Sequence, residues 1–392
     1  MKHFEISRRG LLTAASGVAV TSIKWPVKLV AQHGGGQEKD LIFRSSNPRN
    51  AEPELSKLVQ SWITPTKHFY IRSHAPNPKI DTERYRLTVD GLVRQPLTLN
   101  LADLSRWPRH EVTATLTCAG NRRSEFNSEG KVGGVQWEAG AIGNANWSGI
   151  SLADVLKKAE VLAGAKHVWF EGQDEIERKD GVIPFGGSVP IEKAMLAGKV
   201  PGALLADRMN GEDLTPDHGY PLRTLVPGYI GARSVKWLGK ITVSDKPSPN
   251  HYLATAYKIV QKTDPIDWTE SGPIYRFPIN GAIATPRAKA LVPAGLINVS
   301  GYVLPTGRLD VTTQRVQISS DNGTSWQPTT LLGKGVDYCW QLWSAKVRIT
   351  PQTKKLLLRA FDSSGGFMPQ RVPWNAKGYL QNSWYELPIE VS

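Results

Sequence analysis

Cysteine is scarce in this chain, with only two among 392 residues. Two cysteines cannot build a disulfide framework, a cysteine-rich zinc module or a cysteine-ligated iron–sulfur cluster. The sequence also lacks an apolar run of about 18 residues, the length at which a membrane-spanning helix is expected. We therefore predict a protein without a membrane span, whose core is held by packing rather than by covalent cross-links.

Common cofactor and nucleophile motifs are missing too. The sequence contains no G-x-G-x-x-G, Walker, C-x-x-C-H, H-E-x-x-H or G-x-S-x-G motif. Dinucleotide cofactors, nucleoside triphosphates, covalent c-type haem and the usual serine hydrolase chemistry are therefore disfavoured. The eight histidines include no pair at i and i+4 that could bind a metal from one helix face.

Positive charge exceeds negative charge. The 48 Lys and Arg residues outnumber the 35 Asp and Glu residues, which gives a formal net charge of +13 at pH 7. The basic residues are spread along the chain, without the basic block or aromatic-interleaved stripe of a nucleic-acid-binding surface. We therefore expect a small anionic ligand or an acidic partner rather than nucleic acid.

Residues 1–31 have the pattern of a targeting segment. The segment from Ser7 to Leu12 combines the pair Arg8-Arg9 with the start of a mildly apolar run that ends near Ile23. This pattern predicts a twin-arginine signal and a periplasmic location; the alternative is a chance basic N-terminus. Without residues 1–31, 43 basic and 34 acidic residues leave a net charge of +9. The twin-arginine route transports folded proteins, so it suits an enzyme whose cofactor is inserted before export.

Residues 40–261 mix helix and strand patterns without a regular βα period, which predicts an α+β domain. An apolar stripe at helical spacing follows Ser151, which we expect to cap that helix: Leu152, Val155, Leu156 and Ala159. The other expected elements are a helix face at Leu55, Leu58, Val59 and Trp62, and strands at 86–93, 111–117 and 168–170.

From residue 262 to residue 392 the pattern changes to short strands separated by turns such as Asp321-Asn322-Gly323. Such a pattern predicts an immunoglobulin-like β-sandwich, here without the paired cysteines of antibody domains. We place the domain boundary in the polar, proline-containing stretch 246–273. The expected strands are 296–304, 311–319, 338–343, 347–349, 356–361 and the alternating closing segment 385–391.

One loop carries the clearest chemical signal. Cys118 follows the expected strand 111–117 and is followed by Ala119-Gly120-Asn121-Arg122-Arg123. Adjacent cations stabilise a thiolate, which is the form that attacks electrophiles or binds metals. A cysteine after a strand is also compatible with a buried structural residue.

The segment from Cys118 to Arg123 resembles the cofactor-ligating segment of the sulfite oxidase family of molybdenum enzymes. The resemblance continues, in order, through the chain from about residue 50 to residue 392. It implies a mixed α/β molybdopterin-binding domain over residues 40–261 and an immunoglobulin-like dimerisation domain over residues 262–392. The matching segments are 69–74, 137–147, 170–174, 217–223, 231–237, 257–258, 374–378 and Trp384.

The resemblance also implies roles for individual residues. Cys118 is the implied protein ligand of a molybdenum ion held by one molybdopterin. No haem is expected, because the sequence has no c-type haem motif. The implied substrate-binding and catalytic residues are Arg72, Cys118, Arg123, Trp137, Tyr257 and Lys377. The implied cofactor-binding residues are Tyr70, Ile71, Arg72, Ser73, His74, Cys118, Asp174, His218, Arg223, Ser234, Val235 and Lys236.

Two of these positions carry open questions. Trp137 is implied to wall the pocket, but a large aromatic side chain could equally belong to the core. Lys377 stands where vertebrate and plant members of the family carry arginine. Lysine keeps the charge and loses the bidentate fork, so sulfite affinity and anion selectivity are expected to differ there.

The implied reaction is oxygen-atom transfer that converts sulfite to sulfate, with electrons passed singly to an external c-type cytochrome. The resemblance also implies a homodimer formed through the C-terminal domain. The main alternative is a related molybdopterin activity: dehydrogenation of sulfane sulfur, or reduction of methionine sulfoxide or another S- or N-oxide. Two other classes are a hydrolase with Cys118 as nucleophile and a non-catalytic exported binding protein. Cys339 is expected to be a buried free thiol, since a Cys118–Cys339 disulfide would contradict the ligand role.

Overall fold

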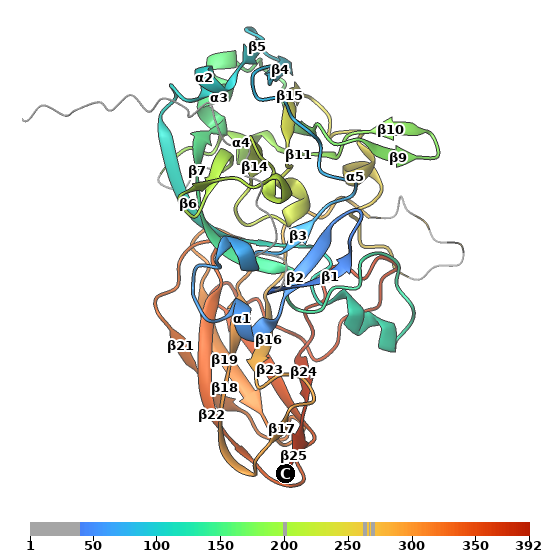
Figure 1. Ribbon diagram of the computed structural model, residues 1–392, viewed down its shortest axis with the longest axis vertical. Coiled ribbons are helices and arrows are strands. Elements are labelled where there is room, and N and C mark those ends of the chain that lie inside the picture. The colour runs from blue at the N-terminus through green and yellow to red at the C-terminus, as the bar shows by residue number, and fades with distance from the viewer. Residues whose placement is uncertain (1–39, 199–201, 262–264, 266, 268–270) are drawn as a thin grey trace, which may run out of the picture. The chain divides into compact units, whose positions relative to one another are not determined.

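A computed structural model describes residues 40–198, 202–261, 265, 267 and 271–392 (Figure 1). The predicted export signal 1–31 lies outside the described residues, and so does part of the stretch in which we place the domain boundary. The predicted boundary at residue 262 therefore stays a prediction. In the described part of the chain, no helix is long and apolar enough to cross a membrane.

Two sheets organise the first region. One is a mixed sheet in the order β11-β8-β15-β4-β5, where only β15 and β4 run parallel. The other has the order β13-β12-β7-β6, with β14 also paired to β12. Their strands are β4 (Leu87–Gly91), β5 (Leu97–Leu99), β6 (Arg109–Thr117), β7 (Ile142–Ser151), β8 (His167–Gly172), β11 (Gly186–Pro190), β12 (Leu204–Met209), β13 (Glu212–Asp213), β14 (Arg223–Leu225) and β15 (Leu238–Ser244).

The helix α3 (Leu152–Ala159) packs its predicted apolar stripe against the first of these sheets, and all four stripe residues are fully buried. Ser151 occupies the N-cap position as predicted, but the expected cap bond is wrong, because its side chain makes no cap hydrogen bond. Ser151 is instead the last residue of β7 and pairs with Leu204 of β12. The first amide of the helix, that of Leu152, donates to the Ala203 carbonyl at 3.1 Å. The residue before β12 thus supplies an acceptor for one of the amides that a helix start leaves unpaired.

The strand β6 leads to the candidate ligand. Its residues Val112, Ala114 and Leu116 are buried at alternate positions, as the sequence predicts, and pack in one cluster with Cys118 and Trp147. Alternation places successive side chains on opposite faces, so the same strand presents one face to this core. Cys118 follows directly after the last residue of β6, so this strand fixes the position of its backbone.

The remaining elements of the first region are short. The helix predicted around 55–62 exists, but it spans a single turn before the chain bends. These elements are the sheet β1 (Leu41–Ser45), β2 (Asn50–Pro53) and β3 (Ile71–Arg72), the hairpin β9 (Ile176–Arg178) and β10 (Gly181–Ile183), and the helices α1 (Leu55–Leu58), α2 (Leu101–Leu104), α4 (Ile191–Met195) and α5 (His251–Ala254).

The C-terminal region forms two four-stranded sheets in the orders β16-β18-β22-β21 and β20-β19-β23-β24, coloured orange to red in Figure 1. Their inward side chains form one buried cluster that contains Val316, Trp343 and Leu358. The strands are β16 (Asn280–Thr285), β18 (Gly295–Leu304), β19 (Thr313–Ser319), β20 (Gln327–Pro328), β21 (Thr330–Leu332), β22 (Gln341–Ile349), β23 (Lys355–Asp362) and β24 (Tyr385–Pro388), with β17 (Leu291–Val292) and β25 (Glu390–Val391) as a separate pair.

Two strand predictions in this region are wrong in detail. The segment 347–349 and the end of the segment 338–343 belong to one strand, β22, because pairing with β18 continues through Ser344, Ala345 and Lys346. Residues 338–340 precede this strand, which begins at Gln341. The closing segment 385–391 is two strands, since β24 pairs with β23 whereas β25 runs parallel to β17. Pro388 has no amide hydrogen to continue a ladder, and it is the last residue of β24.

Arg122 ties the loop after Cys118 to the C-terminal region. Its side chain is fully buried and donates to Asn280 Oδ1 at 3.0 Å and to the carbonyl oxygens of Ser383 and Trp384 at 2.9 and 3.2 Å. It also forms a two-point ion pair with Glu125 at 2.8 and 2.7 Å. Arg122 therefore acts as a structural link between the two regions.

Replacing Arg122 by methionine is expected to destabilise the protein by about 2–4 kcal/mol, because several buried acceptors would lose their donor together. Urea unfolding, followed by circular dichroism, measures this loss. The replacement Arg94→Met is the matched control, since Arg94 is exposed and pairs only with the exposed carboxylate of Glu160. Equal stability of the two variants would contradict the structural role.

Candidate functional site

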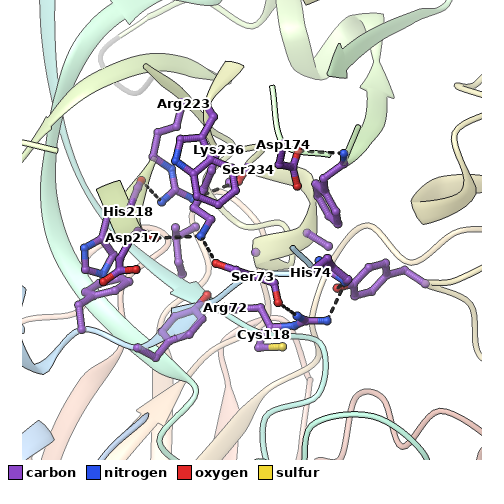
Figure 2. A pocket seen from close by; sticks show the side chains of 18 residues that line it. Arg72, Ser73, His74, Cys118, Asp174, Asp217, His218, Arg223, Ser234 and Lys236 are labelled. Atoms are coloured by element: carbon purple, nitrogen blue, oxygen red, sulfur yellow. Dashed lines mark hydrogen bonds between the residues drawn. The ribbon is translucent and has the colours of Figure 1, made fainter. Parts of the chain in front are cut away.

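A cavity of about 680 Å³, part of it open to solvent, lies beside the end of β6. It collects side chains from β3, the loop after β6, β14 and the segment before β15 (Figure 2). Of the residues that the sequence predicts, it is lined by Tyr70, Arg72, Ser73, His74, Cys118, Asp174, His218, Arg223, Ser234, Lys236 and Tyr257. Segments far apart in the sequence thus meet in one place.

The loop after β6 holds Cys118 by its backbone. The Cys118 amide donates to the Ala141 carbonyl at 2.9 Å, and the Cys118 carbonyl accepts from the Asn121 amide at 3.0 Å. The Gly120 amide points at Cys118 Sγ, with 3.4 Å between nitrogen and sulfur. Cys118 and Cys339 are both free thiols, so the excluded disulfide is absent among the described residues. The sulfur is therefore available to a ligand in the cavity.

Two cations, the buried Arg223 and the half-buried Lys236, line another part of the cavity. Nζ of Lys236 donates to Ser73 Oγ and to the Asp217 carbonyl, each at 2.8 Å. Arg223 donates to the carbonyl oxygens of His218 and Ser234 at 2.9 and 3.0 Å. Within the described residues neither cation forms an ion pair with a carboxylate. A buried cation without a carboxylate partner favours an anionic ligand.

Burial lowers the pKa of both cations. The pKa of Lys236 falls from 10.5 to about 7, first because the ammonium is buried and then because Arg223 lies near it. The pKa of Arg223 falls to about 10, mainly through burial. An anion that binds between them would restore the charged state of Lys236.

This shift predicts a pH dependence for the cofactor-free protein. An unfolded lysine keeps its proton up to its ordinary pKa of 10.5, whereas folded Lys236 releases it near pH 7. The unfolded state binds more protons between these limits, so stability should rise as the pH increases from about 7 to about 9. Melting temperatures measured across this range test the expectation. The variant Lys236→Met should lose part of the rise, because Lys193, with a pKa lowered to about 8, contributes as well.

His218 and Asp174 complete this part of the cavity. His218 Nδ1 lies 2.8 Å from Thr215 Oγ1, while its Nε2 is buried without a hydrogen-bond partner among the described residues. Burial lowers the pKa of His218 to about 4, so the ring is neutral at pH 7. Asp174 Oδ1 accepts from the Phe185 amide at 3.0 Å. The unpartnered nitrogen of His218 is a polar atom that a bound ligand would satisfy.

His74 joins two predicted substrate residues. Its Nε2 lies 2.7 Å from Nη2 of Arg72 and 3.2 Å from Oη of Tyr257. Burial and the charge of Arg72 lower the pKa of His74, so its Nε2 accepts from both donors. Arg72 also donates to Asn50 Oδ1 at 3.2 Å and to the Ser73 carbonyl. Figure 2 shows Arg72, His74 and Cys118 in one part of the cavity.

The structure places other predicted residues outside the cavity lining. Ile71 and Val235 are buried beside residues that line it. Trp137 is fully buried in the same core cluster as Cys118, so the structure places it in the core rather than in the cavity wall.

Arg123 contacts Lys377 next to the loop that carries Cys118. Nε of Arg123 donates to the Lys377 carbonyl and its Nη1 donates to the Val135 carbonyl, both at 2.9 Å. A Cβ atom on Gly120 would lie 2.5 Å from Nη2 of Arg123, so the guanidinium packs directly on the loop of Cys118. Burial, and then the charge of Arg123, lower the pKa of Lys377. Arg122 points into the C-terminal region instead. Arg123 and Lys377 are not among the residues that line the cavity, and Arg123 packs on the loop that carries Cys118.

Sequence reasoning missed several lining residues. Asp217 and Trp237 lie in segments that carry the family resemblance, but their side chains gave no separate signal. Phe185 stacks on His74 with ring centroids 4.7 Å apart, and no pattern in the sequence pointed to it. The other missed lining residues are Phe69, Leu116, Gly231 and Ala232.

Comparison with known proteins decides the family. The description "Oxidoreductase molybdopterin binding domain" matches residues 74–252, and "Mo-co oxidoreductase dimerisation domain" matches residues 271–392. The chain is 40% identical over 359 residues to sulfite oxidase of Gallus gallus, with 88% of this chain and 77% of that protein covered. The chain belongs to the sulfite oxidase family of molybdopterin oxidoreductases.

Other relatives agree with this assignment. Sulfite oxidase of Arabidopsis thaliana is 36% identical over 375 residues, with 90% of this chain and 94% of that protein covered. Mitochondrial sulfite oxidase of Homo sapiens is 37% identical over 366 residues, and the match covers 90% of this chain and 66% of the human protein. The chain therefore spans about two thirds of the length of that relative.

A solved structure confirms the predicted fold class. The sulfane dehydrogenase SoxCD from Paracoccus pantotrophus superposes with a TM-score of 0.75 and 24% identity, covering 95% of this chain and 98% of that chain. The predicted order of a mixed α/β molybdopterin-binding domain and a dimerisation domain is confirmed as well.

The residues of the cavity fit the molybdopterin cofactor of the family. An anionic pterin phosphate matches Lys236 and Arg223, which have no carboxylate partner in the described part of the chain. The unpartnered Nε2 of His218 can accept from or donate to the pterin. Cys118 supplies a soft sulfur donor, which suits a metal already bound by sulfur. The residues that line the cavity therefore fit this cofactor.

Proposed function

We propose that this protein oxidises sulfite to sulfate with molybdenum bound by molybdopterin. The observation that carries the proposal is the placement of Cys118 in a cavity with Arg72 and Tyr257, beside buried cations that suit an anionic cofactor. The sulfite oxidases of Gallus gallus and Arabidopsis thaliana, to which the chain is similar, support sulfite as the substrate. The overall change is SO₃²⁻ + H₂O to SO₄²⁻ with release of two protons and two electrons.

When bound, the cofactor supplies the oxygen-atom transfer and takes up both electrons. The residues of the chain bind and orient the substrate. Arg72, held by Asn50 and the Ser73 carbonyl, presents positive charge to an oxyanion. The neutral ring of His74 fixes the hydroxyl of Tyr257, whose hydrogen can be donated to a substrate oxygen instead. Arg123 adds a second cation whose Nη2 has no acceptor among the described residues.

Lys377 contributes a compact charge beside Arg123. A lysine ammonium binds an oxyanion as a point charge, whereas a guanidinium would grip two oxygens. Burial, and then the charge of Arg123, lower the pKa of Lys377, and an anion bound nearby would shift this pKa back upward.

The proposal includes the route of the electrons and the location of the enzyme. We propose an external c-type cytochrome as acceptor, which takes the two electrons one at a time. The arginine pair within residues 1–31 supports twin-arginine export to the periplasm, where such cytochromes occur. The match to a dimerisation domain at residues 271–392 supports a homodimer.

One experiment tests the substrate. Purified, molybdenum-containing protein is mixed with cytochrome c as oxidant and with either sulfite or thiosulfate as substrate. In a separate assay, a reduced dye supplies electrons for the reduction of methionine sulfoxide. Sulfite-dependent reduction of the cytochrome, with sulfate as product, is the expected result. Turnover of thiosulfate or methionine sulfoxide at a higher kcat/KM than sulfite would replace the proposal by the related molybdopterin activities.

A further inference from the structure

Tyr379 has a fixed position near the site although no sequence pattern pointed to it. Its amide donates to Asn375 Oδ1 at 2.9 Å, and its carbonyl accepts from Asn375 Nδ2 at 3.0 Å. One buried side chain thus holds both backbone groups of Tyr379. The tyrosine side chain itself is 8% exposed, so its ring is packed among neighbours rather than in solvent.

The ring of Tyr379 lies between two residues proposed to bind the substrate. It stacks on the ring of Tyr257 with centroids 5.2 Å apart and an angle of 15° between the planes. Its ring centroid is 5.0 Å from Cζ of Arg123. The buried guanidinium of Arg233 lies 5.7 Å from the centroid of the Tyr257 ring. The four side chains therefore form a column in the order Arg233, Tyr257, Tyr379, Arg123.

The two residues before Tyr379 also contact Arg123. The carbonyl of Lys377 accepts from Nε of Arg123 at 2.9 Å. Gly378 has φ +57°, and a Cβ atom there would lie 2.7 Å from Cγ of Arg123. Nε and Nη1 donate to carbonyl oxygens and so fix the plane of the guanidinium, and the ring of Tyr379 packs against this group, which leaves Nη2 for a further acceptor. Among the described residues no carboxylate pairs with Arg123 and no acceptor takes Nη2.

We propose that Tyr379 is a positioning residue for the oxyanion site, which fixes Tyr257 and Arg123 relative to each other. Its action is on substrate binding, because it touches both anion-binding side chains and does not line the cavity itself. Stacking and cation–π contacts hold the two side chains in one arrangement before the anion arrives, which reduces the cost of ordering them. The identity of the anion as sulfite rests on the proposed function.

The test compares Tyr379→Leu with Tyr379→Phe in molybdenum-containing enzyme. The leucine variant should raise the KM for sulfite about tenfold and change kcat by less than about twofold, since ring contacts of this kind are lost. The phenylalanine variant keeps the ring and should keep the KM within about twofold. Tyr379→Met, which preserves volume without a ring, takes the place of the leucine variant if that variant does not fold.

Tyr385 provides a matched control. Cζ of Arg122 lies 5.0 Å from the Tyr385 ring, so the neighbouring arginine stacks on a tyrosine in the same way but away from the cavity. Tyr385→Leu should therefore lower the melting temperature while the KM for sulfite stays within about twofold. A rise in KM as large as that of Tyr379→Leu would overturn the positioning role and indicate a general loosening of the loop.

A second readout does not depend on turnover. Calorimetry on the molybdenum-containing protein measures the Kd for sulfate, a related oxyanion. Tyr379→Leu should weaken sulfate binding about tenfold, and Tyr379→Phe should not. Unchanged sulfate binding in the leucine variant would overturn the inference. Wild-type protein that binds sulfate but does not oxidise sulfite would instead refute the proposed function, and the effect on sulfate binding would still test Tyr379.

Discussion

Cys118→Ser should lower sulfite turnover about a thousandfold, which corresponds to about 4 kcal/mol of lost transition-state stabilisation. A thiolate is a soft ligand that a metal deprotonates readily, whereas a serine hydroxyl is hard and keeps its proton at neutral pH. The change replaces one sulfur atom by oxygen in a residue that is 7% exposed. The backbone hydrogen bonds of Cys118 with Ala141 and Asn121 do not depend on the sulfur. The fold should therefore be retained. Sulfite-dependent reduction of cytochrome c measures the loss of turnover, and a melting curve measures whether the fold is retained.

The second cysteine supplies the control. Cys339 is buried, its Sγ lies 3.3 Å from the Thr113 carbonyl, and burial raises the pKa of its thiol to about 12. The sequence prediction of a buried free thiol is confirmed. Cys339→Ser should leave turnover within about twofold of wild type, because the site does not use this sulfur. Normal sulfite oxidation by Cys118→Ser would refute the ligand assignment.

Lys236→Met is expected to remove most of the bound cofactor. Loss of a buried cation that contacts an anion costs about 2 kcal/mol or more, so pterin and molybdenum content should fall about tenfold or more. The cofactor-free protein should nevertheless become at least as stable as wild type, since a buried charge is replaced by an apolar side chain of similar length. Pterin fluorescence after oxidation, elemental analysis and melting curves measure these opposite changes.

Lys240→Met is the matched control for this experiment. Lys240 is half exposed and pairs with the half-exposed Asp90 at 3.0 Å, so its loss should change neither cofactor content nor stability appreciably. If Lys236→Met kept the cofactor and melted far below wild type, the lysine would be a structural residue and not a phosphate-binding one.

The sequence predicted those elements whose pattern repeats in a simple way. The alternation of Val112, Ala114 and Leu116 located β6, and the stripe after Ser151 located α3, because burial of one face leaves a periodic trace. The error at Ser151 arose because a residue can end a strand and precede a helix at once. Its neighbour on β12 is far away in the sequence, and no local pattern reports such a pairing.

In the site, too, the features with a distinctive sequence pattern were predicted, and those that depend on contacts between distant segments were not. The resemblance named many residues that meet in the cavity, since their order along the chain is distinctive. It gave a role to Arg123 and none to Arg122, a difference that the adjacent pair does not show by itself, because neighbouring residues of one type differ only in the direction of their side chains. Arg122 has φ +67° and points into the C-terminal region, whereas Arg123 starts a 3₁₀ helix and faces the loop of Cys118. Tyr379 was missed for a related reason: its role depends on rings brought together from distant segments.

X-ray absorption at the molybdenum edge tests the central claim most directly. Wild-type protein and Cys118→Ser, each purified with its cofactor, are compared for the number of sulfur neighbours of molybdenum. The account predicts that the variant has one sulfur neighbour fewer than the wild type. An unchanged sulfur count in a variant that still contains the pterin would show that Cys118 is not the ligand.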